Sequence, residues 1–125
     1  MASNYFSQFN REYLFELPQE LLDLPKEEKY QSTAAAAAKY GDEIVTIIAY
    51  GISTNHSPKA KTERNGWVAT EQNMINVPYH QLPELERMMN DVNAVKLCKQ
   101  GHLGIQFIGY TNEWGDQFKV KWVDM

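Results

Sequence analysis

The sequence predicts a mainly β domain, in which five strands form a small Greek-key barrel with one or two helices and an N-terminal arm. Three observations lead to this prediction. Residues 102–123 form two β-rich runs around Asn112, Gly115 and Asp116, which are turn-forming residues and indicate a hairpin. Residues 43–54 are β-branched almost throughout. A helical pattern lies between the third predicted strand and the final hairpin.

Residues 1–30 are expected to form an arm that packs on the barrel or on a second subunit. Large apolar and aromatic side chains are frequent here, and they gain free energy when they leave water. Residues 13–17 are typical of a short strand, and Pro18 suits the first position of a helical turn that runs to Leu24. A chain of 125 residues fits a single domain, so the arm and barrel are taken as one unit.

The alanine run at residues 34–38 predicts a helix of two turns. Ser32 or Thr33 suits the N-cap, alanine has the highest helix propensity, and Gly41 suits the position after the last turn. Small side chains also suit a tightly packed strand, so both structures stay open at this point.

The middle of the chain predicts three strands and two helical segments. The strand at 43–54 contains Gly51, which marks a bend or bulge. Shorter strands are expected at 66–70 and 74–77, and Pro78 ends the last of them. A helix follows, with Pro83 in its first turn, and Asp91 is placed to cap a further turn that ends at Gly101.

The last predicted strand alternates between two kinds of side chain. Phe118, Val120 and Trp122 point to one face, while Lys119 and Lys121 point to the other. A helix between a third strand and a closing hairpin is the layout of a small five-stranded Greek-key barrel, the OB-fold. A generic α+β sheet has the same order of elements, so the topology stays open.

Catalytic and metal-binding patterns are lacking in the sequence. The three histidines are far apart, and no nucleophile or phosphate-loop motif is present. Cys98 lies in an apolar-periodic stretch, where cysteine is far more often a core residue than a nucleophile. We therefore expect a protein that is not an enzyme and that needs no cofactor or metal.

The charge and cysteine content limit the location and the partners. A single cysteine fits a reducing cytoplasm, and no apolar run is long enough to cross a membrane. The formal net charge of −4 argues against a general polyanion binder, although basic residues gather in the loop at 55–65 and in the last strand.

Binding of single-stranded nucleic acid needs cations along a groove and flat aromatic faces for stacking. Trp114 is expected to be exposed in the turn, whereas Trp67 fits the core better than a binding surface, and the strand lysines also fit an ordinary solvated face. The candidate binding residues are Tyr50, Lys59, Lys61, Arg64, Trp67, Tyr110, Trp114, Lys119 and Lys121.

A protein–protein interaction module is the alternative function. The aromatic arm and the lack of excess basic residues favour it, and a homodimer through the arm or a sheet edge fits the same features.

Three stretches of the chain resemble a known family. They are residues 40–51, the apolar helix at 82–92, and the closing hairpin with 104–107 on one strand and 115–120 on the other. Together they resemble small phage-encoded single-stranded DNA-binding proteins. The resemblance implies an OB-fold, sequence-independent DNA binding in phage replication or recombination, and self-association as a dimer or larger oligomer. It also implies contacts with replication or recombination proteins in the host cytoplasm.

Overall fold

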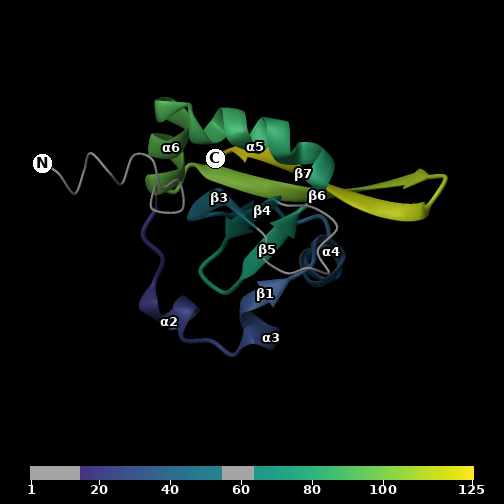
Figure 1. Cartoon of the computed structure of the whole chain (residues 1–125), viewed down its shortest axis with the longest axis horizontal. Coiled ribbons are helices and arrows are strands. Elements are labelled where there is room, and N and C mark those ends of the chain that lie inside the picture. Colours follow the sequence, from purple (N-terminus) through teal and green to yellow (C-terminus); the bar gives the residue numbers. More distant parts are fainter. Residues whose placement is uncertain (1–14, 55–63) are drawn as a thin grey trace, which may run out of the picture.

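The computed structural model describes residues 15–54 and 64–125, which form a mixed α/β architecture with two β-sheets (Figure 1). The first sheet has the order β1-β5-β4-β3, and the second has the order β2-β6-β7. The strands are β1 (Tyr30–Gln31), β2 (Val45–Thr46), β3 (Ala49–Thr54), β4 (Arg64–Ala69), β5 (Met74–Val77), β6 (Leu103–Asn112) and β7 (Gly115–Asp124). The predicted strand content is thus present, arranged as two sheets, and within the described ranges these strands do not close into one barrel.

Helices lie before, between and after the strands of the first sheet. They are α2 (Gln19–Leu22), α3 (Lys26–Lys29), α4 (Thr33–Tyr40), the short 3-10 helix η2 (Tyr79–Gln81), α5 (Leu82–Met89) and α6 (Val92–Lys99). The predicted break between two helical segments is confirmed, because the Asp91 carboxylate accepts hydrogen bonds from the N–H groups of Asn93 and Ala94 at the start of α6. No helix in this part of the chain has the length and apolar character needed to cross a membrane.

Strands β2 and β3 are two halves of one stretch that connects the sheets. β2 pairs antiparallel with β6, and β3 pairs antiparallel with β4. The change of partner is sharp: the Ile47 N–H donates to the Leu103 carbonyl at 3.0 Å, and the next N–H, from Ile48, donates to the Ala69 carbonyl at 2.8 Å. Neighbouring strands therefore follow the order β5, β4, the continuous stretch of β3 and β2, then β6 and finally β7.

The change of partner does not lie at Gly51, where the sequence predicted a bend. Glycine is needed there for a different reason, since a Cβ atom at this position would lie 2.7 Å from the Trp67 ring. Gly51 and Trp67 are directly paired across β3 and β4, so the indole lies over the glycine.

A glutamine side chain takes the place of a neighbouring strand beside β7. The Gln81 Nε2 group donates to the Val120 carbonyl at 2.6 Å, and the Val120 N–H donates to Gln81 Oε1 at 2.8 Å. Gln81 is buried, and these two bonds are made to one residue, as between two paired strand residues. The amide thus satisfies the edge of β7 where no described strand pairs with it.

Helix α4 packs against both sheets, on the side of the molecule where β5 and β7 are not hydrogen-bonded to each other. The Thr33 hydroxyl donates to the Asn76 carbonyl of β5, and the Tyr40 ring stacks on Phe107 of β6 with centroids 6.2 Å apart. Ala36 and Ala37 are buried, and their small side chains allow this close approach.

The helix expectation for the alanine run is confirmed, and the strand alternative is wrong. The Ser32 hydroxyl accepts a hydrogen bond from the Ala35 N–H at 3.0 Å, which caps the helix. Gly41 follows the last turn with a positive φ of 58°, a conformation that favours glycine.

From residue 15 onward the arm packs against its own chain. Phe15 and Leu21 are buried in the single chain, and the Phe15 ring lies 4.8 Å from the Tyr50 ring. The predicted helical turn after Pro18 corresponds to α2, while residues 15–17 are not part of a strand. The sequence did not predict α3 or β1, which pairs in parallel with β5.

We expect Gln81→Leu to lower the free energy of unfolding by about 1–3 kcal/mol, because the buried N–H and C=O of Val120 would lose their partners. Urea denaturation measures this change. Gln106→Leu is the matched control: its Nε2 group also donates to a backbone carbonyl, that of Asp42, but the side chain is half-exposed and water can replace the bond. Equal losses in the two variants would contradict this role of Gln81.

Candidate nucleic-acid interface

The register of β6 and β7 places six polar, cationic and apolar side chains on one face of the hairpin. Directly paired residues share a face, and residues two apart along a strand share it as well. The pairs are Tyr110 with Gln117, Ile108 with Lys119, and Gln106 with Lys121. We call these six residues the hairpin face.

The other face of the same hairpin enters the core. Phe107 and Val120 are directly paired and buried, and Phe118 and Trp122 pack against the core. The predicted alternation of β7 is therefore confirmed, with Lys119 and Lys121 exposed on the outer side.

The hairpin face is positively charged although the chain as a whole is acidic. Neither Lys119 nor Lys121 forms an ion pair with a residue in the described ranges. Asp116 and Asp124 belong to β7, but the register places both on the opposite face. The hairpin face itself thus carries two ammonium groups and no carboxylate.

Aromatic side chains continue this surface toward the hairpin turn. Trp114 is 79% exposed, and its backbone N–H donates to the Asn112 side chain at 2.9 Å, which stabilises the turn. Tyr110 is half-buried, and the His80 ring meets it edge to face at 6.2 Å. Tyr79, which precedes His80 in the chain, is 66% exposed.

Sequence reasoning did not identify His80 as part of this surface. It follows Pro78 and Tyr79 at the end of a strand, and no local pattern places it beside Tyr110. Only the return of the chain through α5, α6 and β6 brings His80 and Tyr110 together.

Two of the candidate stacking residues lie in the core instead. Tyr50 is fully buried, and its hydroxyl donates to the Met88 carbonyl of α5 at 2.7 Å. Trp67 is 8% exposed and covers Gly51. These side chains lie on β3 and β4, where the elements packed against the first sheet remove them from solvent, so neither offers a free ring face.

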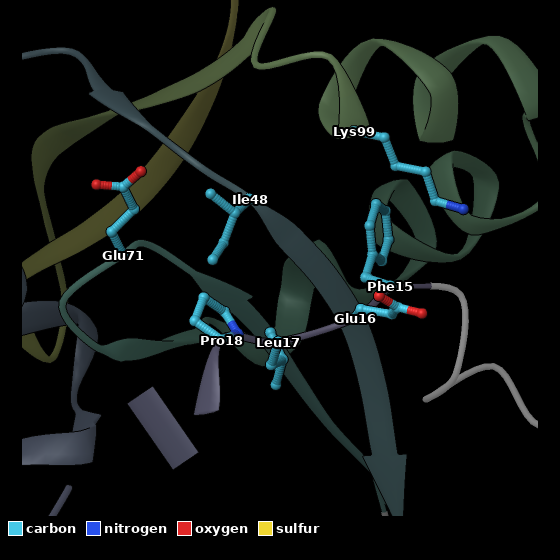
Figure 2. Close-up of a pocket in the computed structure, with 7 residues that line it drawn as sticks. All are labelled: Phe15, Glu16, Leu17, Pro18, Ile48, Glu71 and Lys99. Carbon is cyan, nitrogen blue, oxygen red and sulfur yellow. The ribbon is translucent and has the colours of Figure 1, made fainter. Parts of the chain in front are cut away.

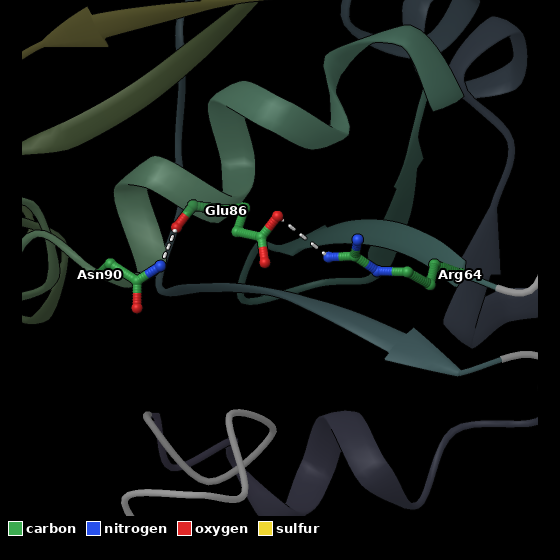
Figure 3. Close-up of polar contacts among 3 residues, drawn as sticks. All are labelled: Arg64, Glu86 and Asn90. Atoms are coloured by element: carbon green, nitrogen blue, oxygen red, sulfur yellow. Dashed lines mark hydrogen bonds and ion pairs between the residues drawn. The ribbon is translucent and has the colours of Figure 1, made fainter.

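Arg64 is separated from the hairpin lysines. Its Nη2 atom forms an ion pair with Glu86 Oε2 on α5, at 3.4 Å. Figure 3 shows this contact as a dashed line. Two residues earlier, Glu84 accepts a hydrogen bond from Trp122 Nε1 at 2.8 Å. Helix residues two apart point to nearly opposite sides, so Arg64 and β7 lie on different sides of α5. Lys59 and Lys61 lie outside the described residues.

A groove runs between α5 and β7 beside the hairpin face. It consists of two hollows of about 480 Å³ and 420 Å³, which share Glu84 and Trp122. The first is lined by Gln81, Glu84, Ile108, Lys119, Val120, Lys121 and Trp122, and the second by Glu84, Arg87, Met88, Asp91 and Trp122. We call this feature the α5–β7 groove.

Another hollow, of about 670 Å³, lies where the arm meets the change of strand partner. Figure 2 shows Glu71 on one side of it and Glu16 and Lys99 on the other, with Ile48 and Pro18 between them. Its polar groups do not converge on a common point, which a binding site for a small polar ligand requires.

Cys98 has the properties of a core residue. Burial raises the pKa of its thiol to about 12, although the adjacent Lys99 ammonium lowers it in part. The thiolate that a nucleophile or metal ligand needs is therefore scarce near neutral pH. Among the residues that the structure describes, no group of three or more histidine, cysteine or acidic side chains is placed to hold a metal ion.

The chain matches no protein-family model, no curated protein and no solved structure.

The high pKa of Cys98 predicts slow alkylation. At pH 8 iodoacetamide should label Cys98 much more slowly in the native protein than in the urea-unfolded chain, where a thiol titrates near its ordinary pKa of about 8.5. The native rate should keep rising as the pH increases toward 12, because more thiolate forms there. Mass spectrometry of quenched samples measures both rates, and equal rates would contradict the buried environment.

Proposed function

We propose that the protein binds single-stranded DNA without strong sequence preference, through the hairpin face and the exposed tryptophan at the hairpin turn. We further propose that its fold is an OB-like five-stranded barrel that stays open between β5 and β7. The strand order and the position of α5 and α6 between β5 and β6 support this assignment, because OB-folds have a helix between their third and fourth strands.

The observation that carries the proposal is the charge separation across the hairpin. Lys119 and Lys121 stand on a face without carboxylates, next to Ile108 and Tyr110, while the acidic residues of β7 are on the other face. Cations that lie in line along a strand can follow a phosphate backbone, and each neutralised phosphate releases a counterion. The base sequence of the DNA does not affect this contact, because every nucleotide carries the same phosphate.

The exposed indole of Trp114 favours single strands over duplexes. Its side chain is 79% exposed, and the turn end of the β6–β7 hairpin extends away from the other labelled elements (Figure 1). Stacking on such a ring requires a base that is free of its own neighbours, as in a single strand. Every base has a flat face, so this contact also tolerates any sequence.

The biological setting follows from the resemblance described above and is part of the proposal. We propose a role in phage replication or recombination in the host cytoplasm, with the protein acting as a homodimer or higher oligomer. Contacts with other replication or recombination proteins belong to the same proposal. Phosphate neutralisation and base stacking require neither a cofactor nor catalysis.

A non-enzymatic protein–protein interaction module of a phage or bacterium is the second candidate function. Ile44 and Met125 are each about half-exposed, and both lie within contact distance of where a Gly104 side chain would begin. This apolar pair at the far end of the second sheet fits a protein partner better than a nucleic acid. Failure of DNA binding in the following experiments would favour this candidate.

Removing the two lysines should weaken binding and reduce its salt dependence. We expect the double variant Lys119→Gln/Lys121→Gln to bind a short oligo-dT less tightly, and the slope of log K against log salt to decrease by about 1.4, or about 0.7 for each lost phosphate contact. Fluorescence anisotropy over a range of salt concentrations measures both effects.

Lys26→Gln/Lys96→Gln is the matched control, because it removes the same charge from exposed helix positions. It should leave the slope almost unchanged. If both double variants changed the slope equally, binding would depend on net charge alone and not on the hairpin face.

Trp114→Ala should remove one stacked base. The expected loss is about 1–3 kcal/mol of binding free energy, roughly fivefold to 150-fold in Kd, with little change in thermal stability because the side chain is exposed. Trp114→Phe keeps an aromatic face and should retain most of the affinity. Wild-type affinity in the alanine variant would show that Trp114 makes no stacking contact.

A further inference from the structure

The α5–β7 groove combines cationic, aromatic and acidic groups within a few residues of the hairpin face. Lys119 and Lys121 line one of its hollows, Arg87 lines the other, and Trp122 and Glu84 belong to both. Volumes of about 480 Å³ and 420 Å³ lie in the range of small-molecule sites. The groove is therefore large enough for part of a nucleotide.

Within the described ranges, only one of the two carboxylate oxygens of Glu84 accepts hydrogen bonds. Its Oε2 atom accepts hydrogen bonds from Trp122 Nε1 at 2.8 Å and from Gln81 Nε2 at 3.3 Å. Its Oε1 atom accepts no hydrogen bond from any residue in the described ranges. A carboxylate can accept about four hydrogen bonds, so Glu84 has capacity for another donor in the groove.

A carboxylate in a groove that faces lysines is unfavourable for phosphate but favourable for particular bases. It repels the backbone, so a bound strand would have to turn a base toward it. Cytosine has an exocyclic amino group that donates to carboxylates, whereas thymine has a carbonyl oxygen at the same position, which a carboxylate repels.

The Trp122 ring is held in place for such a base. Its Nε1–H bond to Glu84 fixes the indole, and the side chain is only half-buried. A base that stacks on the exposed part of this ring would have its edge near Glu84, while Lys119 and Lys121 would meet the flanking phosphates.

We propose that the α5–β7 groove holds one base of the bound strand and that Glu84 selects, at this position, bases with an amino group over thymine. The inference rests on the proposed binding of single-stranded DNA and adds a base preference to it. Glu84 is thus a specificity-determining residue within an otherwise sequence-tolerant surface.

The test compares two strands that differ mainly at the selecting position. Oligo-dT and an oligonucleotide of 5-methyl-deoxycytidine have the same C5 methyl group. At position 4 one has a carbonyl and the other an amino group, and at the adjacent N3 atom thymine has a hydrogen and 5-methylcytosine a lone pair. We expect the wild-type protein to bind the 5-methyl-deoxycytidine strand roughly threefold to tenfold more tightly, which is the net effect of one typical hydrogen bond in a groove open to water. Competition binding at mildly alkaline pH measures the ratio of the two Kd values.

Glu84→Gln should abolish or reverse this ratio. The glutamine carbonyl can still accept from Trp122, which leaves its amide N–H₂ toward the groove as a donor to the thymine carbonyl. Both strands should bind more tightly because a negative charge is lost. The ratio, and not the absolute affinity, is therefore the readout.

Glu113→Gln is the matched control, since it removes the same charge from an exposed position in the hairpin turn. This variant should bind both strands more tightly and keep the wild-type ratio of the two Kd values. Equal wild-type affinity for the two strands, or a preference that persists in Glu84→Gln, would overturn the inference while the proposed function stands. If neither strand binds, the proposed function fails, and this inference fails with it.

Discussion

The pairing register of β6 and β7 is the constraint on which the core and the proposed interface both depend. It pairs Phe107 with Val120 on the inner face and Ile108 with Lys119 on the outer face. A shift of one residue in one strand would turn its inner side chains toward solvent and its outer ones toward the core. The two lysines are therefore kept outside by the cost of burying them and by the gain from burying their neighbours. The Gln81 amide supports this arrangement, because its two hydrogen bonds to Val120 hold β7 at a defined position along α5.

Local patterns in the sequence predicted the elements well, whereas contacts between distant segments could not be predicted. The Ser32 cap, the alanine run and Gly41 identify α4, and the alternation of β7 identifies its two faces, because these signals depend on near neighbours along the chain. The change of strand partner at Ile47 and Ile48 has no such signal. It depends on which strands lie on either side, and a run of β-branched residues is compatible with either partner.

The residues of the candidate site likewise fall into those that the sequence could predict and those that it could not. The exposure of Trp114 could be predicted, because a turn with Asn112 and Gly115 has little room for a buried indole. Tyr50 could not be assigned, since a tyrosine on a strand can face either the core or solvent, and here α5 covers it and accepts its hydroxyl bond. Glu84 did not stand out in the sequence as a site residue. Only the folded chain brings its carboxylate to the Trp122 indole, 38 residues away along the chain.

The most direct test of the proposed interface is a map of the amide chemical shifts by NMR during titration with a short oligo-dT at low salt. The proposal predicts that the largest changes fall on residues 106–110 and 117–121 and on the indole N–H of Trp114, and that the Trp67 and Tyr50 amides change little. Absence of any change, or changes confined to β1, β5 and the arm, would contradict binding through the hairpin face.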